Sequence, residues 1–548
     1  MAIIDLHSSV NEEVLPLLQC DICVVGSGPA GSTIMRELSS SNRQIVLLES
    51  GGAERNVEID TLNEIENVGR ARASDQWSVR NRVLGGSSYT WGGRCAGFDA
   101  FDFEEREWVP YSSWPIALTQ IIPYLDRSAS HLGLAMGSGF SDERFWEIAQ
   151  RAPPNSEVDP ALLLPFFWQF SRDDAEAYPF EYMRFGRHLP SRLGPNVTLV
   201  TGATVLRVLP VESATSVQGV EFATLDGRKH RITAPTVVLC AGGIENARIL
   251  LNSDTVTPAG LGNDHDQVGR YLMDHLRGPA AFFKVGGSRA LQRRFGRYNV
   301  KGHLFRAGLR LSPDVQRKES LLNCSAWLGE ILAWDDPWDA LRRFAGRAPI
   351  FPQDAVSLVK NIPLMLRGVV DYFGARNGFP RKLDELTLDC MCEQVPDPDS
   401  RITLSDRRDQ LGMRLPKIDW RSHPEESRTM RRMAELVAEE FPTIGLPKPV
   451  LADWVREGAE IPSAFVDVAH PTGTTRMSSD STKGVVDVNC EVHGVSGLFI
   501  AGSSVFPTVG HCNPTQMIVA MAVRMADHLK TRKSNSTPGR AVMHAVSP

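Results

Sequence analysis

Short apolar runs and apolar residues at helical spacing alternate at the start of the chain. Residues 20–25 (CDICVV) form an apolar run that Gly26 ends, and Ala30, Ile34 and Leu38 then recur at i, i+4 and i+8. A second apolar run, residues 44–50 (QIVLLES), follows. The pattern predicts strand, turn, helix and strand, which is how a parallel α/β sheet begins.

The middle of the chain is rich in strand patterns. β-branched runs at 196–208, 218–223 and 230–239 predict strands, and a glycine turn then leads into a helix over 244–253. Strand signals recur at 276–330, 385–420 and 484–505, and 424–441 has the apolar stripe of an amphipathic helix. Residues 514–529 are apolar on nearly every side, which predicts a deeply buried last helix.

Two segments lack a clear strand pattern. Residues 81–110 are rich in Gly and aromatics without a period, which indicates an ordered loop. Residues 331–380 combine helical patches with aromatic and basic residues. An ordinary amphipathic insertion is favoured there, and an oligomer contact, a lid or a membrane-surface helix are the alternatives. The tail, residues 536–548, is expected to be mobile.

Composition excludes several classes of protein. A chain of 548 residues predicts two or more domains. The net charge of −6 argues against a nucleic-acid partner, because phosphate binding needs a positive surface. No apolar run is long enough to span a bilayer, so no integral membrane segment is expected. The N-terminus lacks the pattern of a secretory signal, and a cytoplasmic location is therefore expected.

The cysteines indicate reduced thiols. Nine are scattered along the chain, and an odd number does not suggest a disulfide framework. Cys20 and Cys23 have the Cys-x-x-Cys spacing of redox-active cysteines, but they begin an apolar strand rather than a helix. We therefore do not expect a redox role for them. No second Cys/His pair completes a zinc site, and no metal is expected.

The first turn carries a dinucleotide fingerprint. In Gly26-Ser-Gly28-Pro-Ala-Gly31, the first glycine permits the turn, the second lets the backbone approach a pyrophosphate, and the third allows the helix to pack closely on the strand. Glu49, at the end of the second strand, is placed to accept hydrogen bonds from a ribose diol. The acid favours a dinucleotide without a 2′-phosphate, which leaves FAD and NAD open.

Motifs spread along the chain resemble the glucose–methanol–choline (GMC) oxidoreductase family, and are nearest to its sugar- and glycoside-oxidising, pyranose oxidase-like members. They are VLGGSSYTWGGR (83–94), VVLCAGGIENARILLNS (237–253), VGRYLMDH (268–275), AHPTGTTRM (469–477) and GLFIAGSSVFPTVGHCNPT (497–515). The resemblance implies an α/β fold with a Rossmann-type FAD-binding domain and a second α+β substrate domain built on an antiparallel sheet. It assigns 1–110, 196–275 and 465–535 to the first domain, and 111–195 and 276–464 to the second.

The same resemblance implies FAD as the cofactor. Besides the fingerprint residues and Glu49, the positions expected to contact FAD are Ala30, Gly85, Gly86, Ser87, Ser88, Val205, Ala241, Ala501, Gly502, Asn513 and Thr515. Some sugar-oxidising relatives attach FAD covalently through a histidine in the GGxSxHW stretch. Here Thr90 stands at that position, before Trp91. Threonine cannot form that bond, so non-covalent FAD is expected.

The resemblance also indicates the catalytic pair. Alcohol oxidation needs a base for the hydroxyl proton and a polar group that orients the oxygen, and a neutral imidazole is suited to the first task. His470 in HPTGT and Asn513 in NPT match the family's His/Asn type. A loop histidine satisfied by backbone and an Asn that caps the last helix are the structural alternatives. His511 either orients substrate or packs in the core.

The expected reaction is FAD-dependent oxidation of an alcohol, with a secondary hydroxyl of a sugar or glycoside favoured by analogy. O₂, a quinone or another acceptor takes the electrons, and a homo-oligomer is a further expected partner. The alternatives are a lyase of the same family that keeps FAD, an oxidoreductase of a non-sugar alcohol, and an NAD dehydrogenase with a Rossmann half.

Overall fold

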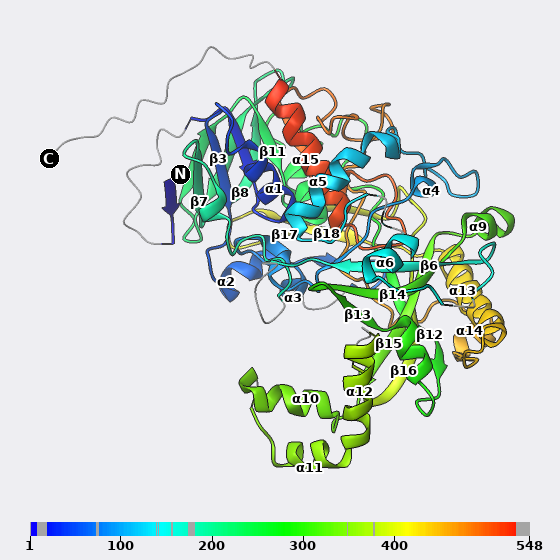
Figure 1. The fold of residues 1–548 in the computed structure, drawn as a ribbon. Coiled ribbons are helices and arrows are strands. Elements are labelled where there is room, and N and C mark those ends of the chain that lie inside the picture. Colours follow the sequence, from blue (N-terminus) through cyan, green and yellow to red (C-terminus); the bar gives the residue numbers. More distant parts are fainter. Residues whose placement is uncertain are drawn as a thin grey trace.

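The fold is taken from a computed structural model, which describes residues 2–7, 19–72, 76–138, 140, 142–154, 157–173, 181–347, 349–375 and 379–532. The tail 536–548, which we expected to be mobile, lies outside these residues. Figure 1 shows the two halves of the molecule, with α1 and α15 in one and β12 to β16 in the other.

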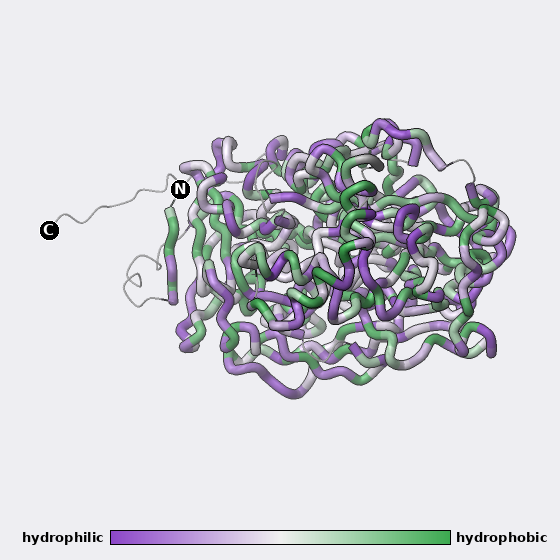
Figure 2. The backbone as a smooth tube through the Cα atoms, turned by 60° about the horizontal axis from the view of Figure 1, so that its bottom comes forward, coloured by the Kyte–Doolittle hydropathy of each residue, from purple (hydrophilic) through white to green (hydrophobic). Residues whose placement is uncertain are grey.

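A six-stranded parallel sheet forms the core of the first half. Its strand order is β1-β7-β3-β2-β11-β20, and all five pairings are parallel. The strands are β1 (Ala2–Asp5), β2 (Ile22–Val25), β3 (Ile45–Glu49), β7 (Val197–Thr201), β11 (Val237–Leu239) and β20 (Leu498–Ile500). Most of their residues are buried, and Figure 2 shows long apolar stretches in the strands beside the N-terminus. The predicted strand–turn–helix–strand opening is confirmed.

Helices α1 (Pro29–Leu38), α5 (Ile122–Leu132) and α15 (Thr515–Thr531) form one layer, in which α15 contacts both other helices and α1 contacts β2 of this sheet. The predicted all-round burial of the last helix is confirmed, because ten of its residues are buried. Helix α7 (Gly242–Leu251) follows β11 and is also largely buried. Glycine at position 31 permits the close contact of α1 with the first turn, since a Cβ there would lie 1.9 Å from the Gly26 carbonyl oxygen.

The second half is built on an eight-stranded antiparallel sheet, as expected. Its order is β19-β12-β16-β15-β14-β6-β5, and β13 pairs with β14. The strands are β5 (Arg94–Cys95), β6 (Leu163–Phe170), β12 (Leu276–Phe283), β13 (Arg297–Val300), β14 (His303–Leu311), β15 (Cys324–Leu332), β16 (Leu383–Cys392) and β19 (Val450–Leu451). Helix α13 (Pro424–Thr443) packs on β12, β15 and β16. Strand β5 belongs to this sheet although its residues fall in the range assigned to the FAD domain.

Two smaller sheets and several short helices complete the fold. Two three-stranded sheets combine β8 (Thr204–Pro210), β9 (Val217–Ala223) and β10 (Lys229–Thr233), and β4 (Glu66–Asn67), β17 (Arg401–Arg408) and β18 (Arg414–Asp419). The short helices are α2 (Val57–Asp60), α3 (Gln76–Val79), α4 (Ala100–Phe103), α6 (Asp142–Ala149), α8 (Arg289–Phe295), α9 (Pro313–Glu319) and α14 (Asp453–Arg456). The expected strand at 484–492 is wrong, because these residues form only isolated bridges around loops.

The insertion at 331–380 forms α10 (Pro337–Arg342), α11 (Pro352–Lys360) and α12 (Ile362–Ala375), which project from the second half (Figure 1). Its outer side chains include Leu366, Val370 and Phe373, all strongly exposed. Among the described residues no helix has the length and hydropathy to cross a membrane. All nine cysteines are buried, and no disulfide joins any of them.

Candidate active site

A cavity of about 590 Å³ lies at the carboxyl ends of β2, β3, β11 and β20 and reaches the antiparallel sheet. Ligands of open parallel sheets bind at this edge, where the strand order reverses direction. Gly26 begins the turn there with φ +93°, and a Cβ at this position would lie 2.8 Å from the Cys240 carbonyl oxygen. The fingerprint therefore forms one wall of the cavity.

Three glycines bring bare backbone to the cavity. A Cβ on Gly28, Gly242 or Gly502 would meet no protein atom within 4 Å, and all three residues line the cavity. The N-terminus of α1, which begins after Gly28, has no side-chain cap. Unpaired N–H groups and the positive end of the helix dipole at such a wall fit the pyrophosphate of a dinucleotide.

Glu49 lies at the end of β3 and is held in one orientation. Its Oε2 accepts hydrogen bonds from the Ser27 amide at 2.9 Å and hydroxyl at 2.6 Å, and its Oε1 accepts one from the Gly51 amide at 2.9 Å. The side chain is buried and borders the cavity. A carboxylate in this position fits the ribose diol that the sequence predicted.

Asn246 on α7 joins the turn that follows β11 to the turn that follows β20. Its Oδ1 accepts from the Ala241 amide at 2.9 Å, and its Nδ2 donates to the Ala501 carbonyl at 3.3 Å and the Ser504 hydroxyl at 3.0 Å. Sequence reasoning missed this residue, although it lies in the quoted 237–253 motif. The network fixes the positions of Ala241 and Ala501 relative to each other.

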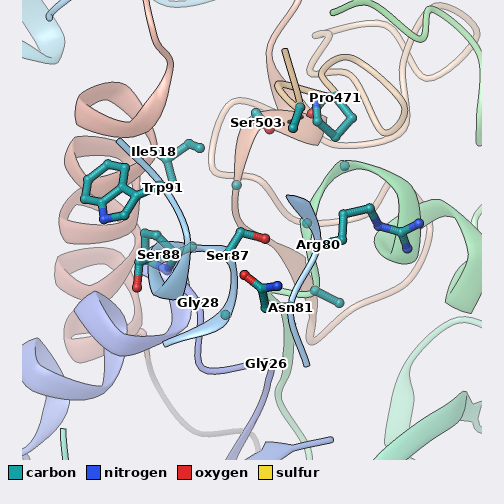
Figure 3. Close-up of a pocket in the computed structure, with 18 of the residues that line it drawn as sticks. Gly26, Gly28, Arg80, Asn81, Ser87, Ser88, Trp91, Pro471, Ser503 and Ile518 are labelled. Atoms are coloured by element: carbon teal, nitrogen blue, oxygen red, sulfur yellow. Dashed lines mark hydrogen bonds between the residues drawn. The ribbon is translucent and has the colours of Figure 1, made fainter. Parts of the chain in front are cut away.

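Most of the predicted FAD contacts meet in this cavity. Figure 3 shows Gly26, Gly28, Ser87 and Asn81 around one space, with Pro471 and Ser503 on its far side. Of the predicted positions, those that border it are Gly26, Gly28, Ala30, Glu49, Gly86, Ser87, Ser88, Val205, Ala241, Ala501, Gly502, Asn513 and Thr515. Gly31 and Gly85 do not, and both instead permit close backbone packing: a Cβ on Gly85 would lie 2.3 Å from the Gly186 nitrogen.

The loop that carries His470 is fixed by a buried ion pair. Asp274 accepts the His470 amide at 3.0 Å and pairs with Arg72 at 2.7 Å, and Arg72 also pairs with Asp467 at 2.9 Å. Ala469, just before His470, has φ +62°. This strained conformation is uncommon for a residue with a side chain and is typical of functional sites.

The ring of His470 lies between two partners. His470 Nδ1 is 3.0 Å from His275 Nδ1, and its Nε2 is 3.2 Å from Asn513 Nδ2. The other nitrogen of His275, Nε2, lies 3.0 Å from the Gly510 carbonyl oxygen. A carbonyl only accepts, so in the neutral pair His275 carries its proton on Nε2 and accepts at Nδ1. His470 consequently donates from Nδ1, which leaves the lone pair of Nε2 directed at Asn513.

Electrostatics keep both rings neutral. Burial is the largest cause that holds the pKa of His470 well below its ordinary 6.5. Positive charge at His275 or Arg94 lowers this pKa further, whereas Asp467 raises it. Burial is also the main cause that lowers the pKa of His275. A neutral His470 has a free lone pair on Nε2 near pH 7, as a general base requires.

Asn513 does not cap the last helix. Helix α15 begins at Thr515 with no side-chain cap bond, and Asn513 Nδ2 donates to His470 instead. Its Oδ1 is buried without a hydrogen-bond partner among the described groups. The capping alternative is therefore wrong, and the amide is available to a ligand in the cavity.

His511 lies apart from the cavity. Its Nδ1 accepts from Asn323 Nδ2 at 2.9 Å, and its ring meets Phe166 edge-on, with the centroids 4.8 Å apart. The residue is 1% exposed and does not border the cavity. The segment before α15 is irregular, and His511 does not turn into the cavity as Asn513 does. Of the two alternatives, this placement favours packing.

Further residues at the cavity escaped sequence reasoning. They come from the loop before the GGSSY motif and from the antiparallel sheet: Arg80, Asn81, Arg82, Arg94, Arg277, Trp327 and Met391. The last three belong to β12, β15 and β16, whose pairing sets Arg277 opposite Met391. Only the strand register brings them together, and one sequence does not contain that register.

A parallel sheet with a glycine-lined phosphate wall, next to an antiparallel sheet and a histidine–asparagine pair, defines a dinucleotide-binding redox enzyme with a separate substrate domain. Family models described as GMC oxidoreductase match residues 187–277 and 396–522. The chain therefore contains the N-terminal and C-terminal domains that these models describe. It is an FAD-dependent oxidoreductase that acts on alcohols, and the residues of the cavity fit that cofactor.

Similar proteins match either nearly the whole chain or a short part of it. A 6'''-hydroxyparomomycin C oxidase from Streptomyces lividus is 24% identical over 93% of this chain and 92% of its own length. A C-glycoside 3-oxidase from Microbacterium trichothecenolyticum is 48% identical over 61 residues, which are 11% of this chain and 12% of its own length. The structure of a pyridoxine 4-oxidase superposes with a TM-score of 0.55 at 18% identity, over 94% of this chain and 100% of that one, which shows a shared fold.

Proposed function

We propose that the protein oxidises a secondary hydroxyl of a sugar or glycoside, with His470 as the base and Asn513 as the group that orients the oxygen. One observation carries this proposal. The neutral imidazole of His470 directs its lone pair at the amide of Asn513, whose oxygen has no partner among the residues that the structure describes, and both side chains border the cavity. Relatives named as oxidases of paromomycin-type compounds and of C-glycosides support the substrate class.

The roles follow from the hydrogen bonds. Bound FAD supplies the acceptor for the hydride of the carbinol carbon. His470 Nε2 takes the hydroxyl proton, and Asn513 Nδ2 donates to the oxygen as its negative charge develops. His275 holds Nδ1–H of His470 by accepting it, so the ring keeps the tautomer that exposes Nε2. The product is the carbonyl compound.

Thr90 supports non-covalent binding. Its hydroxyl donates to Asn81 Oδ1 at 2.6 Å beside the cavity, and it offers no atom for a covalent flavin bond. Oxygen or a quinone as acceptor, a homo-oligomer and the cytoplasmic location stay predictions.

The test is anaerobic mixing of the purified yellow protein with a panel of sugars, glycosides and simple alcohols. Loss of the flavin absorbance with a pyranoside supports the proposal. Loss only with non-sugar alcohols removes the substrate class, and a colour that stays while a substrate is cleaved identifies the lyase alternative. Reoxidation in air, compared with a quinone, then assigns the acceptor.

A further inference from the structure

Arginine side chains gather where the antiparallel sheet meets the cavity. Arg94 on β5 and Arg277 on β12 both border it. Their guanidinium carbons lie 4.9 and 5.1 Å from the ring centroid of Trp327 on β15. Three strands that are far apart in the sequence therefore present two cations and one indole to the same end of the cavity.

Strand register explains this gathering. Arg94 lies opposite Phe170, and Arg306 lies opposite Trp168, two residues along the same strand. Residues that face each other, or lie two apart on one strand, share a face of a sheet. Arg94 and Arg306 therefore share a face, and Arg297 joins them because it pairs with Arg306.

The protein neutralises only part of this charge. Arg277 pairs with Asp389 at 2.9 Å, and Arg306 donates to the Leu328 carbonyl. In the part of the chain that the structure describes, the Arg94 guanidinium has neither a carboxylate nor a hydrogen-bond acceptor, and its contacts are the rings of Trp168 and Trp327.

The environment of Arg94 is correspondingly unfavourable for a cation. Burial lowers its pKa to about 9, and the charges of Arg306, Arg277 and Arg297 add to that effect, while Asp389 opposes it. Its own charge contributes to the low pKa of His470, so the two side chains lie within electrostatic reach of each other. An anion bound at Arg94 would therefore lie near the proposed base.

We propose that the substrate is an alcohol that carries a carboxylate, and that Arg94 and Arg277 bind this carboxylate while His470 faces the hydroxyl that is oxidised. The guanidinium fork matches a carboxylate with two parallel hydrogen bonds, and the half-buried position of Arg94 strengthens them. The inference rests on the proposed function and narrows it to acidic sugars and glycosides. It also predicts rejection of cationic amino sugars.

Three matched probes test whether the site prefers a substrate with a negative charge. Methyl β-D-glucuronide, methyl β-D-glucoside and the 6-amino-6-deoxy glucoside differ only at C6, as anion, neutral group and cation. Calorimetry with the dithionite-reduced holoenzyme, which cannot accept another hydride, measures binding without turnover. We expect the glucuronide to bind about tenfold or more tighter than the glucoside, as for a hydrogen bond to a charged group. The amino sugar should bind weakest.

Arg94→Met and Arg277→Met should each remove most of that preference, measured as the ratio of glucuronide to glucoside affinity in the same variant. Arg297→Met is the matched control, because Arg297 is exposed on the same sheet but does not border the cavity. It should keep the preference. FAD content, read from absorbance, verifies that each variant is folded.

The outcomes separate this inference from the proposed function. If the glucoside bleaches the flavin but the glucuronide binds no tighter, the carboxylate site is wrong and the sugar oxidation stands. If the glucuronide binds tighter through Arg94 but no probe bleaches the flavin, the site stands and the sugar oxidation fails. Unchanged preference in both arginine variants overturns the assignment of the site.

Discussion

The Nδ1 atoms of His275 and His470 lie 3.0 Å apart, and this contact fixes which nitrogen of His470 is basic. The Gly510 carbonyl holds the proton of His275 on Nε2, so His275 accepts from His470. A chain of hydrogen bonds thus runs from a backbone carbonyl through two rings to Asn513. Within the proposed function, His275 is a positioning residue.

Replacing His275 tests this chain. His275→Ala leaves the buried Nδ1–H of His470 without an acceptor, which should slow flavin reduction about 10- to 100-fold. His275→Gln retains one acceptor and one donor and should recover part of the rate. Stopped-flow absorbance measures both. Equal loss in the two variants, together with loss of FAD, would indicate a packing role instead.

Asn513→Ala removes the amide that meets His470. We expect reduction to slow by about 10²-fold, as for loss of one oxyanion donor. The melting temperature should stay close to that of the wild type, because the side chain makes no cap bond to α15. A lower melting temperature with a normal reduction rate would restore the capping role.

The pH profile follows from the depressed pKa of His470. The neutral base is the active form, so kcat/KM should be constant above pH 6.5 and fall only as the pH drops through a value below 6.5. Arg94→Met removes a positive charge that lowers this pKa, and the acid limb should move to higher pH. Profiles of both enzymes with the neutral glucoside measure the shift. A limb that moves to lower pH, or stays in place, contradicts the electrostatic argument.

Non-covalent FAD has a simple test. Denaturation in guanidinium followed by filtration should release all of the flavin from the polypeptide, because Thr90 stands at the position of covalent attachment. Yellow colour retained with the unfolded chain would contradict this expectation and would require another attachment residue.

The local parts of the site were predictable, and the long-range parts were not. Gly26, Gly28 and Glu49 lie within one strand–helix–strand unit whose pattern specifies its geometry. His470 and Asn513 came from the resemblance. Arg94, Arg277 and Asn246 could not be found, because their positions depend on strand register and on a loop-to-loop network. The sequence did not decide between the two alternatives for His511, because alternation of side chains holds only in a regular strand.

The most direct test of the central claim is single-turnover reduction of His470→Ala, mixed anaerobically with the best substrate of the panel. Removing the base while leaving the FAD cavity intact should slow the loss of flavin absorbance by at least ~10²-fold, with FAD still bound at one per chain. A rate near that of the wild type would contradict the assignment of His470 as the base.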